Sequence, residues 1–166
     1  YKSLDEALTH GGISNKVKVN LVRIESDKLK PHQINKKLKN VSGLLIPGGF
    51  GKRGTEGKIS AIKYARDKKI PFLGICFGMQ MAIIEFARNK LKIKKAGSTE
   101  LDKRCYPVVG LINEWNKGGK IIKGTDKNLG GTMRLGLYEA NLRNNSAIKS
   151  IYKSNSIKER HRHRYE

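Results

Sequence analysis

The sequence predicts an α/β fold, with a doubly wound, mostly parallel sheet and helices on both faces of that sheet. Two observations predict it: short apolar segments alternate with segments of helical periodicity, and glycine-rich turns follow two of the apolar segments. The 166 residues, 37% of them hydrophobic, are enough for one domain with a buried core. In such a sheet, loops at the carboxyl ends of the strands form the functional site.

The elements of the first half follow from the spacing of apolar residues. Residues three and four positions apart indicate helices, and alternating or continuous apolar runs indicate strands. We first expect a helix at 1–10 stopped by Gly11 and Gly12, a strand at 17–24, a polar segment at 31–40 that is helical at most, and a strand at 41–46. There follow a helix marked by Ile59, Ile62 and Ala65, a strand at 70–75, and a helix from Gly78 with one apolar face of Met79, Ala82, Ile83, Phe86 and Ala87.

The second half is less regular. Strands are expected at 106–112 and 132–137, and the glycine- and lysine-rich residues 116–131 between them are expected to be a loop. The final segment, ERHRHRYE, is treated as a strand, in which His161 and His163 share one face and Arg164 lies on the other.

Cys76 stands between two glycines, in GICFG, where the strand at 70–75 runs into the next helix. This is the spacing of a G-x-S-x-G nucleophile elbow, in which cysteine can replace serine. A helix N-terminus favours the thiolate, and the N–H groups of Phe77 and Gly49 can face a tetrahedral oxyanion. The elbow also predicts a strained backbone at Cys76.

The alternative for a cysteine is a buried structural role, because free cysteine is among the most buried residue types. At Cys76 the glycine spacing and the helical pattern favour the nucleophile. Cys105, in KRCYPVV, has no such turn and is predicted to be structural.

The charge balance allows a different class of function. There are 35 Lys and Arg residues against 14 Asp and Glu residues, a net charge of +21, which suits a nucleic-acid-binding module. The lysines are scattered, however, and no aromatic residues are interleaved with them, so a solvated surface is the favoured interpretation. No signal sequence or membrane-length apolar run is present, and we expect a cytoplasmic protein that binds neither membrane nor nucleic acid.

Three further patterns give weaker signals. PGGFGKRGTEGK lacks the spacing of a phosphate-binding loop. HRHR with Cys105 falls short of a tetrahedral zinc motif, so no metal site is predicted, and RNA binding by RHRHR ranks below the role for Arg164 given below. His10 and His32 lie in polar surroundings and are predicted to be surface residues.

The sequence resembles a known family in five motifs. PGGFGKRGTEGK, IPFLGICFGMQ, STE, GGTMRLG and ERHRHRYE occur in the order found in the class I glutamine amidotransferase (glutaminase) domain of the CTP synthase family. The first two motifs are typical of glutaminase domains, and the last two point to CTP synthases. The resemblance covers nearly the whole chain. The alternative within the same chemistry is another class I glutamine amidotransferase.

The resemblance implies an enzyme, a ligase of pyrimidine nucleotide biosynthesis. Its glutaminase part hydrolyses L-glutamine through a cysteine thioester, and the ammonia aminates UTP in a separate synthetase domain of the same protein. The family uses ATP, Mg²⁺, UTP, L-glutamine and GTP as an activator, and its full-length members form homotetramers. No cofactor is expected to bind these 166 residues themselves.

The resemblance also assigns residues by position. Cys76 would be the nucleophile, and Gly49 and Phe77 would supply the oxyanion N–H groups. Glutamine would be bound by Gly49, by the run Phe77, Gly78, Met79 and Gln80, and by Glu100 and Arg164. Glu100 would pair with its ammonium and Arg164 with its carboxylate. The loop 50–58 matches the region linked to GTP activation.

Residues 1–166 are accordingly expected to form a single, incomplete glutamine amidotransferase domain. The N-terminal synthetase domain, the first strand and the C-terminal His and Glu segment of the family have no counterpart here. The histidines of RHRHR would face away from Cys76 and would not replace the missing base. We therefore expect the fragment alone to be inactive.

Overall fold

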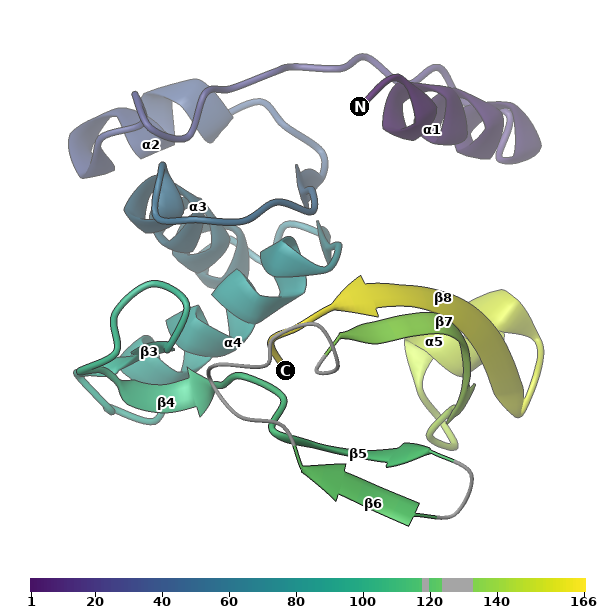
Figure 1. Cartoon of the computed structure of the whole chain (residues 1–166). Coiled ribbons are helices and arrows are strands. Elements are labelled where there is room, and N and C mark those ends of the chain that lie inside the picture. Colours follow the sequence, from purple (N-terminus) through teal and green to yellow (C-terminus); the bar gives the residue numbers. More distant parts are fainter. Residues whose placement is uncertain (118–119, 124–132) are drawn as a thin grey trace. The chain divides into compact units, whose positions relative to one another are not determined.

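The computed structural model describes residues 1–117, 120–123 and 133–166 (Figure 1). Contacts divide the chain into two compact units, which are described separately. The first unit comprises Tyr1–Leu44 and Arg53–Phe72, and the second comprises Leu45–Lys52 and Leu73–Glu166.

Three helices form the first unit: α1 (Lys2–Ser14), α2 (Pro31–Leu38) and α3 (Thr55–Asp67). Helix α2 confirms that the polar segment after Pro31 is helical, and α3 confirms the helix predicted from its apolar spacing. A hydrophobic core links α2 and α3 in this unit. It consists of Leu29, Ile34, Leu38 and Ala61, with Ile24, Val41, Leu44 and Tyr64 packed around them.

Two predictions for the N-terminal segment are wrong. Helix α1 does not stop at Gly11 but continues to Ser14, and residues 17–24 pair with no strand among the described residues. The chain after the helix folds back, and the Val17 N–H donates to the Gly12 carbonyl at 2.9 Å. A Cβ on Gly12 would lie 2.8 Å from the Val17 carbonyl oxygen. Gly12 therefore serves a close backbone approach rather than a helix stop.

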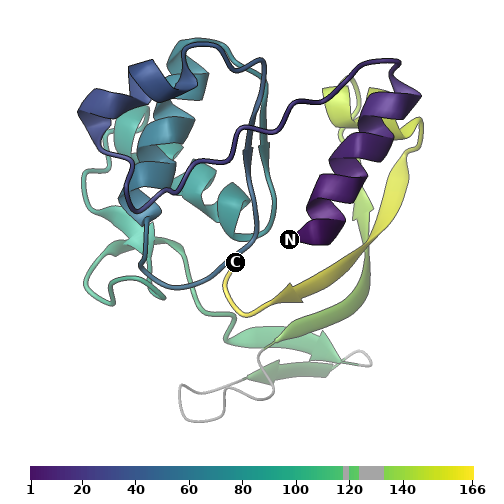
Figure 2. The ribbon, with the colours of Figure 1, turned by 90° about the horizontal axis from the view of Figure 1, so that it is seen from above.

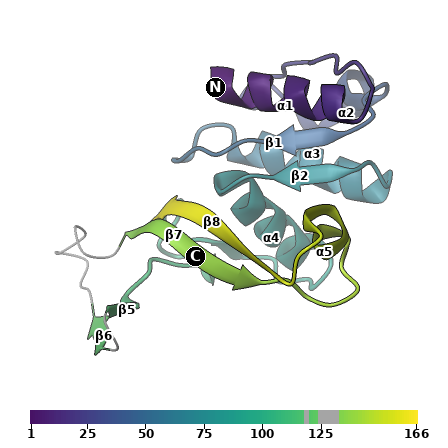
Figure 3. The same ribbon diagram turned by 90° about the vertical axis from the view of Figure 1, so that its right-hand side faces the viewer.

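Strands β1 (Leu44–Ile46) and β2 (Phe72–Gly74) pair with each other, and α3 connects them (Figure 3). The Leu44 N–H donates to the Pro71 carbonyl at 2.9 Å, and the Ile75 N–H donates to the Ile46 carbonyl at 3.0 Å. Helix α4 (Phe77–Asn89) begins directly after β2. The order β1, α3, β2, α4 confirms the predicted alternation of strands and helices.

The remaining strands of the second unit form three further pairs. Strands β3 (Ala96–Ser98) and β4 (Tyr106–Val109) are parallel. Strands β5 (Glu114–Lys117) and β6 (Lys120–Lys123) form an antiparallel hairpin. The long antiparallel pair of β7 (Arg134–Asn141) and β8 (Ser156–His163) is connected through α5 (Ala147–Tyr152), as Figure 2 shows.

These pairs correct two expectations for the second half and confirm a third. The strand expected at 106–112 ends at Val109. The expected loop at 116–131 overlaps β5 and contains the β6 strand, while residues 118–119 and 124–132 lie outside the described part. The strand expected at 132–137 is confirmed from Arg134 onward and is longer than predicted. The sequences of β5 and β6, EWNK and KIIK, have no period-2 alternation, so the pattern did not predict this hairpin.

Helix α4 buries Ala87 of the predicted face but packs mainly through other residues. Phe77, Met81 and Ile84 are buried, and α4 contacts β3 and β4, whereas Met79, Ile83 and Phe86 are 53%, 44% and 49% exposed. The helix is apolar on most of its circumference, so its periodicity could not indicate which face packs against these strands.

Candidate active site

Cys76 has the strained backbone that the elbow predicts. It lies between β2 and α4 with φ 52° and ψ −108°, and its residue is exposed. This pair of angles lies outside the left-handed helical region that a residue with a Cβ can adopt, and such strain costs about 1–3 kcal/mol and clusters at functional sites. The buried structural alternative for Cys76 is therefore wrong. Cys105 is half-buried against Gly97, which agrees with a structural role.

The two glycines of GICFG are required by close contacts on either side of Cys76. A Cβ on Gly74 would lie 2.7 Å from the Met79 nitrogen, in the first turn of α4. A Cβ on Gly78 would run into the Ile46 carbonyl of β1. Because both obstacles are main-chain atoms, neither site has room for a side chain. The spacing read from the sequence thus corresponds to the packing of α4 against both strands.

The glycine turn after β1 lies against the elbow. A Cβ on Gly48 would be 3.6 Å from the Cys76 Cβ, and one on Gly49 would be 3.8 Å from the Phe77 Cδ1. The carboxyl ends of β1 and β2 therefore bring the Gly48 to Gly49 peptide beside the thiol-bearing side chain. The structure confirms that these two motifs meet.

The first turn of α4 is held by its own backbone. The Cys76 carbonyl accepts from the Met79 N–H at 3.0 Å and from the Gln80 N–H at 3.2 Å, and the Gly78 N–H donates to the Ile75 carbonyl at 2.9 Å. Phe77 and Gln80 are buried, whereas Met79 is exposed. The corner is thereby fixed on both sides of the cysteine, as a preorganised site requires.

Glu100 is connected to the same loop. Its Oε1 accepts from the Gly51 N–H at 2.8 Å, and Gly51 has a φ of 75°. The Glu100 N–H donates to the Oγ of Ser98, a buried residue at the end of β3, at 3.2 Å. The sequence did not predict β3, or these partners. A serine two residues before Glu100 is the local signal for such a turn.

Arg164 follows β8 in a segment that is tied to two other parts of the second unit. The Ile112 N–H donates to the Arg164 carbonyl at 2.8 Å, and Gly110 and Glu166 exchange two backbone hydrogen bonds of 2.9 Å. The Gln80 side-chain amide donates to the Tyr165 carbonyl at 2.9 Å. The residue after Arg164 is thus linked directly to the elbow helix.

The two histidines of the last motif lie together, as predicted from strand alternation. The His161 Nδ1 is 2.9 Å from the His163 Nε2, and the His163 Nδ1 is 3.1 Å from the Tyr165 carbonyl oxygen. Strand β8 ends at His163, so Arg164 is in a bend rather than on the opposite strand face.

The loop 50–58 crosses between the two units, and its second half belongs to the first. The Arg53 guanidinium hydrogen-bonds Asp27 at 2.9 Å through Nε, and this bond lowers the pKa of the Asp27 carboxyl and raises the pKa of Arg53. Burial lowers the pKa of Lys58, whose Nζ donates to the Arg53 carbonyl at 3.2 Å. This part of the loop is therefore anchored by polar contacts to residues before α2.

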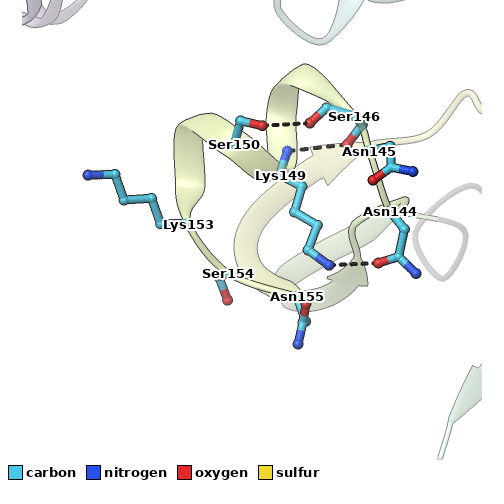
Figure 4. Close-up of a pocket in the computed structure, with 8 residues that line it drawn as sticks. All are labelled: Asn144, Asn145, Ser146, Lys149, Ser150, Lys153, Ser154 and Asn155. Carbon is cyan, nitrogen blue, oxygen red and sulfur yellow. Dashed lines mark hydrogen bonds between the residues drawn. The ribbon is translucent and has the colours of Figure 1, made fainter.

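Other features of the described residues lie apart from these groups. His10 and His32 are exposed, as predicted. No three His, Cys, Asp or Glu side chains among the described residues are placed to hold a metal ion. A polar hollow of about 640 Å³ is lined by residues around α5, including Lys149, whose Nζ donates to Asn144 (Figure 4). It contains none of the predicted site residues.

Within the described part, no helix has the length and apolar character needed to cross a membrane.

Comparison with known proteins agrees with the geometry. A family model described as glutamine amidotransferase class-I matches residues 1–166. Proteins named CTP synthase from Pelagibacter ubique and Brucella anthropi are 75% and 57% identical over the whole of this chain. The chain spans 31% of the length of each of these relatives.

A solved structure gives the same result for the fold. The glutaminase domain of Trypanosoma brucei CTPS with bound acivicin matches with a TM-score of 0.85 and 34% identity, covering all of this chain and 61% of that one. The predicted α/β fold is thereby confirmed. With a family model that matches from the first residue to the last, the chain belongs to the class-I glutamine amidotransferase family.

Proposed function

We propose that this chain is the glutaminase part of a CTP synthase, which hydrolyses L-glutamine and supplies ammonia for the ATP-dependent amination of UTP. The observation that carries the proposal is the elbow: Cys76 is exposed, has a φ of 52°, and begins a helix beside a second glycine turn. The names of its relatives support the choice of CTP synthase among the amidotransferases.

Cys76 is the nucleophile in this proposal. Its Sγ, as the thiolate, forms a bond to the carboxamide carbon, and the carbonyl electron pair moves to the oxygen. Backbone N–H groups of Gly49 and Phe77 donate to that oxyanion. The carbon–nitrogen bond then breaks, the nitrogen takes up a proton, and ammonia leaves a γ-glutamyl thioester. Water cleaves the thioester to glutamate and restores the thiol.

The departing ammonia needs a proton donor. The histidines of β8 are the candidates within the chain, but both nitrogens of His163 are already in hydrogen bonds. We therefore propose that a histidine from another part of the full-length protein acts as the base. Residues 1–166 alone would then turn glutamine over very slowly, because removing such a base costs several orders of magnitude.

The amino-acid end of glutamine is held by charge. Glu100 pairs with the ammonium through a carboxylate that the Gly51 N–H orients, and Arg164 pairs with the carboxylate. Gly78 and Met79 contribute the first turn of α4. Gln80 contributes by anchoring the Tyr165 carbonyl, since its buried amide is directed there.

The rest of the reaction belongs to the synthetase domain of the same protein. ATP, Mg²⁺ and UTP would bind there. GTP would act through the loop 50–58. We propose a cytoplasmic homotetramer, in which these residues form one glutaminase domain.

The proposal is tested with acivicin, the compound bound in the trypanosomal domain. The full-length protein is incubated with acivicin, digested, and analysed by mass spectrometry. We expect one adduct on the peptide that contains Cys76, slowed by excess glutamine and absent from Cys76→Ala. An adduct at Cys105 instead, or labelling that glutamine does not slow, would contradict the proposal.

A further inference from the structure

We propose that His161 and His163 are positioning residues, which hold Arg164 in place for the glutamine carboxylate through the carbonyl of Tyr165. This inference rests on the proposed function, because it assigns Arg164 to the substrate. It gives the two histidines of RHRHRYE a role that neither the elbow nor the substrate contacts provide.

The observation is a continuous set of hydrogen bonds. The His161 Nδ1 lies 2.9 Å from the His163 Nε2, and the His163 Nδ1 lies 3.1 Å from the Tyr165 carbonyl oxygen. The same oxygen accepts from the buried Gln80 amide at 2.9 Å. Two donors from different elements, β8 and α4, therefore converge on one carbonyl.

The direction of these bonds follows from the acceptor. A carbonyl oxygen has no proton to give, so the His163 Nδ1 must carry the hydrogen. In a neutral ring the Nε2 of His163 is then the acceptor, and the His161 Nδ1 must donate to it. One arrangement of protons satisfies all three contacts, and it fixes the tautomer of both rings.

The carbonyl of Tyr165 is a suitable point from which to hold Arg164. The peptide that joins Arg164 to Tyr165 is held as well, since the Arg164 carbonyl accepts from the Ile112 N–H at 2.8 Å. On the N-terminal side, His163 pairs with Arg134 of β7. Because the backbone is restrained on both sides of its Cα, the guanidinium starts from a fixed origin. A planar group that must meet a carboxylate with two parallel bonds gains most from such restraint.

Aromatic contacts hold the first ring of the set. The Tyr138 ring meets His161 edge to face at 5.2 Å between centroids, and the Arg134 guanidinium lies 5.1 Å from the centre of the Tyr138 ring. Arg134 in turn pairs with Glu166 at 2.9 Å. This network joins β7 to the residue that follows Tyr165, so it restrains the same segment from the other end.

A catalytic role for His163 is disfavoured by the same geometry. Its Nδ1 proton is directed at a carbonyl and its Nε2 lone pair at a neighbouring ring, so accepting a proton would break the bond from His161. Positioning and proton transfer also predict different kinetics: a positioning residue changes KM for glutamine, and a base changes kcat.

The test uses the full-length protein and compares leucine with asparagine at each histidine. Asparagine keeps an N–H donor near the position of Nδ1, and leucine does not. We expect His163→Leu to raise the KM for glutamine about fivefold, as the loss of one hydrogen bond would, with kcat within about twofold. His163→Asn should restore most of that loss. His161→Leu and His161→Asn should show the same ordering with smaller changes. His32→Leu, on the surface of α2, is the matched control.

A second set of variants, made in the Arg164→Lys protein, tests whether His163 acts through Arg164. In Arg164→Lys, adding His163→Leu should raise KM by less than about twofold, because the restrained fork is already gone. Equal effects in both backgrounds, no rise in KM for His163→Leu, or a fall in kcat alone would overturn the inference. If His163→Leu also loses ammonia-dependent CTP formation, that variant has misfolded. The inference is then decided by comparing His161→Leu with His161→Asn.

The proposed function is checked separately in the same experiment. Cys76→Ala should abolish glutamine hydrolysis and leave ammonia-dependent CTP formation intact. If Cys76→Ala still hydrolyses glutamine, the proposed function fails, whatever the histidine variants show.

Discussion

Two glycines determine where Cys76 points, because each faces backbone atoms that a side chain would displace. The Cβ positions at Gly74 and Gly78 fall on the main chain of α4 and β1. The chain between them turns within three residues, and the middle one adopts a φ of 52°. The strain at Cys76 persists since packing on both sides leaves the corner no relaxed alternative.

Gly78→Ala should therefore destabilise the glutaminase fold, by about 2 kcal/mol or more, because the Ile46 carbonyl it meets cannot move cheaply. The control is Gly11→Ala in α1, where nothing lies within 4 Å of the Cβ position and alanine should stabilise the helix by about 0.5–1 kcal/mol. The measurement is the temperature at which half of the glutaminase activity is lost. A Gly78→Ala protein as stable as the parent would show that the elbow is more loosely packed than described.

Arg164→Lys should weaken the use of glutamine while leaving activity with free ammonia nearly unchanged. A lysine keeps the charge but loses the planar fork, and we expect a rise in KM of about tenfold or more. CTP formation is measured with each nitrogen source. Equal losses with both would show that Arg164 supports the fold, or the synthetase site, rather than glutamine.

Among the helices and strands, the sequence predicted those for which the hydrophobic pattern and the local turn residues indicate the same structure. β1 and β2 are apolar runs that lead into glycine turns, and α3 and α4 have apolar residues at helical spacing. The glycines of GICFG add a steric requirement at the corner between β2 and α4. β3 has three residues, Ala, Gly and Ser, and carries no pattern. It exists because the Tyr106 N–H and its neighbours pair with it, which is a tertiary effect.

The contacts of the site also divide into those that local patterns predict and those that depend on tertiary pairing. Cys76, Gly49 and Phe77 are close because neighbouring parallel strands end together, which the sequence order implies. The contact of Glu100 with Gly51 joins residues 49 positions apart through the unpredicted β3. No local signal could reveal it, since long-range pairing is decided by the packed fold.

Glu100 gives an element-scale test, because it orients a loop as well as binding a charge. Glu100→Gln keeps an oxygen for the Gly51 N–H and loses the charge, so KM for glutamine should rise about tenfold with kcat little changed. Glu100→Ala loses both and should also lower kcat, by about fivefold, because the turn that carries Gly49 is released. Steady-state hydrolysis of glutamine gives both constants. Identical kcat values in the two variants would show that the Glu100 side chain does not hold the loop that carries Gly49.

The net charge of +21 is a property of the whole molecule that glutamine hydrolysis does not explain. We expect no specific binding of nucleic acid, and a scattered positive surface should give only weak retention on DNA, without sequence preference. Retention on a DNA column should fall steeply between about 50 and 200 mM salt, as for any protein whose contacts are to phosphates. Saturable binding to one RNA or DNA sequence that survives 200 mM salt would instead favour the nucleic-acid-binding alternative.

If Cys76 releases the amide nitrogen of glutamine for CTP synthesis, that nitrogen must appear in the CTP, and isotope transfer detects it. The full-length protein is given ATP, UTP, GTP and glutamine labelled with ¹⁵N at the amide, and the CTP is analysed by mass spectrometry. We expect labelled CTP from the parent protein and none from Cys76→Ala, which should still form CTP from free ammonium. Labelled CTP from Cys76→Ala, or none from the parent while ammonium still supports synthesis, would contradict this role of Cys76.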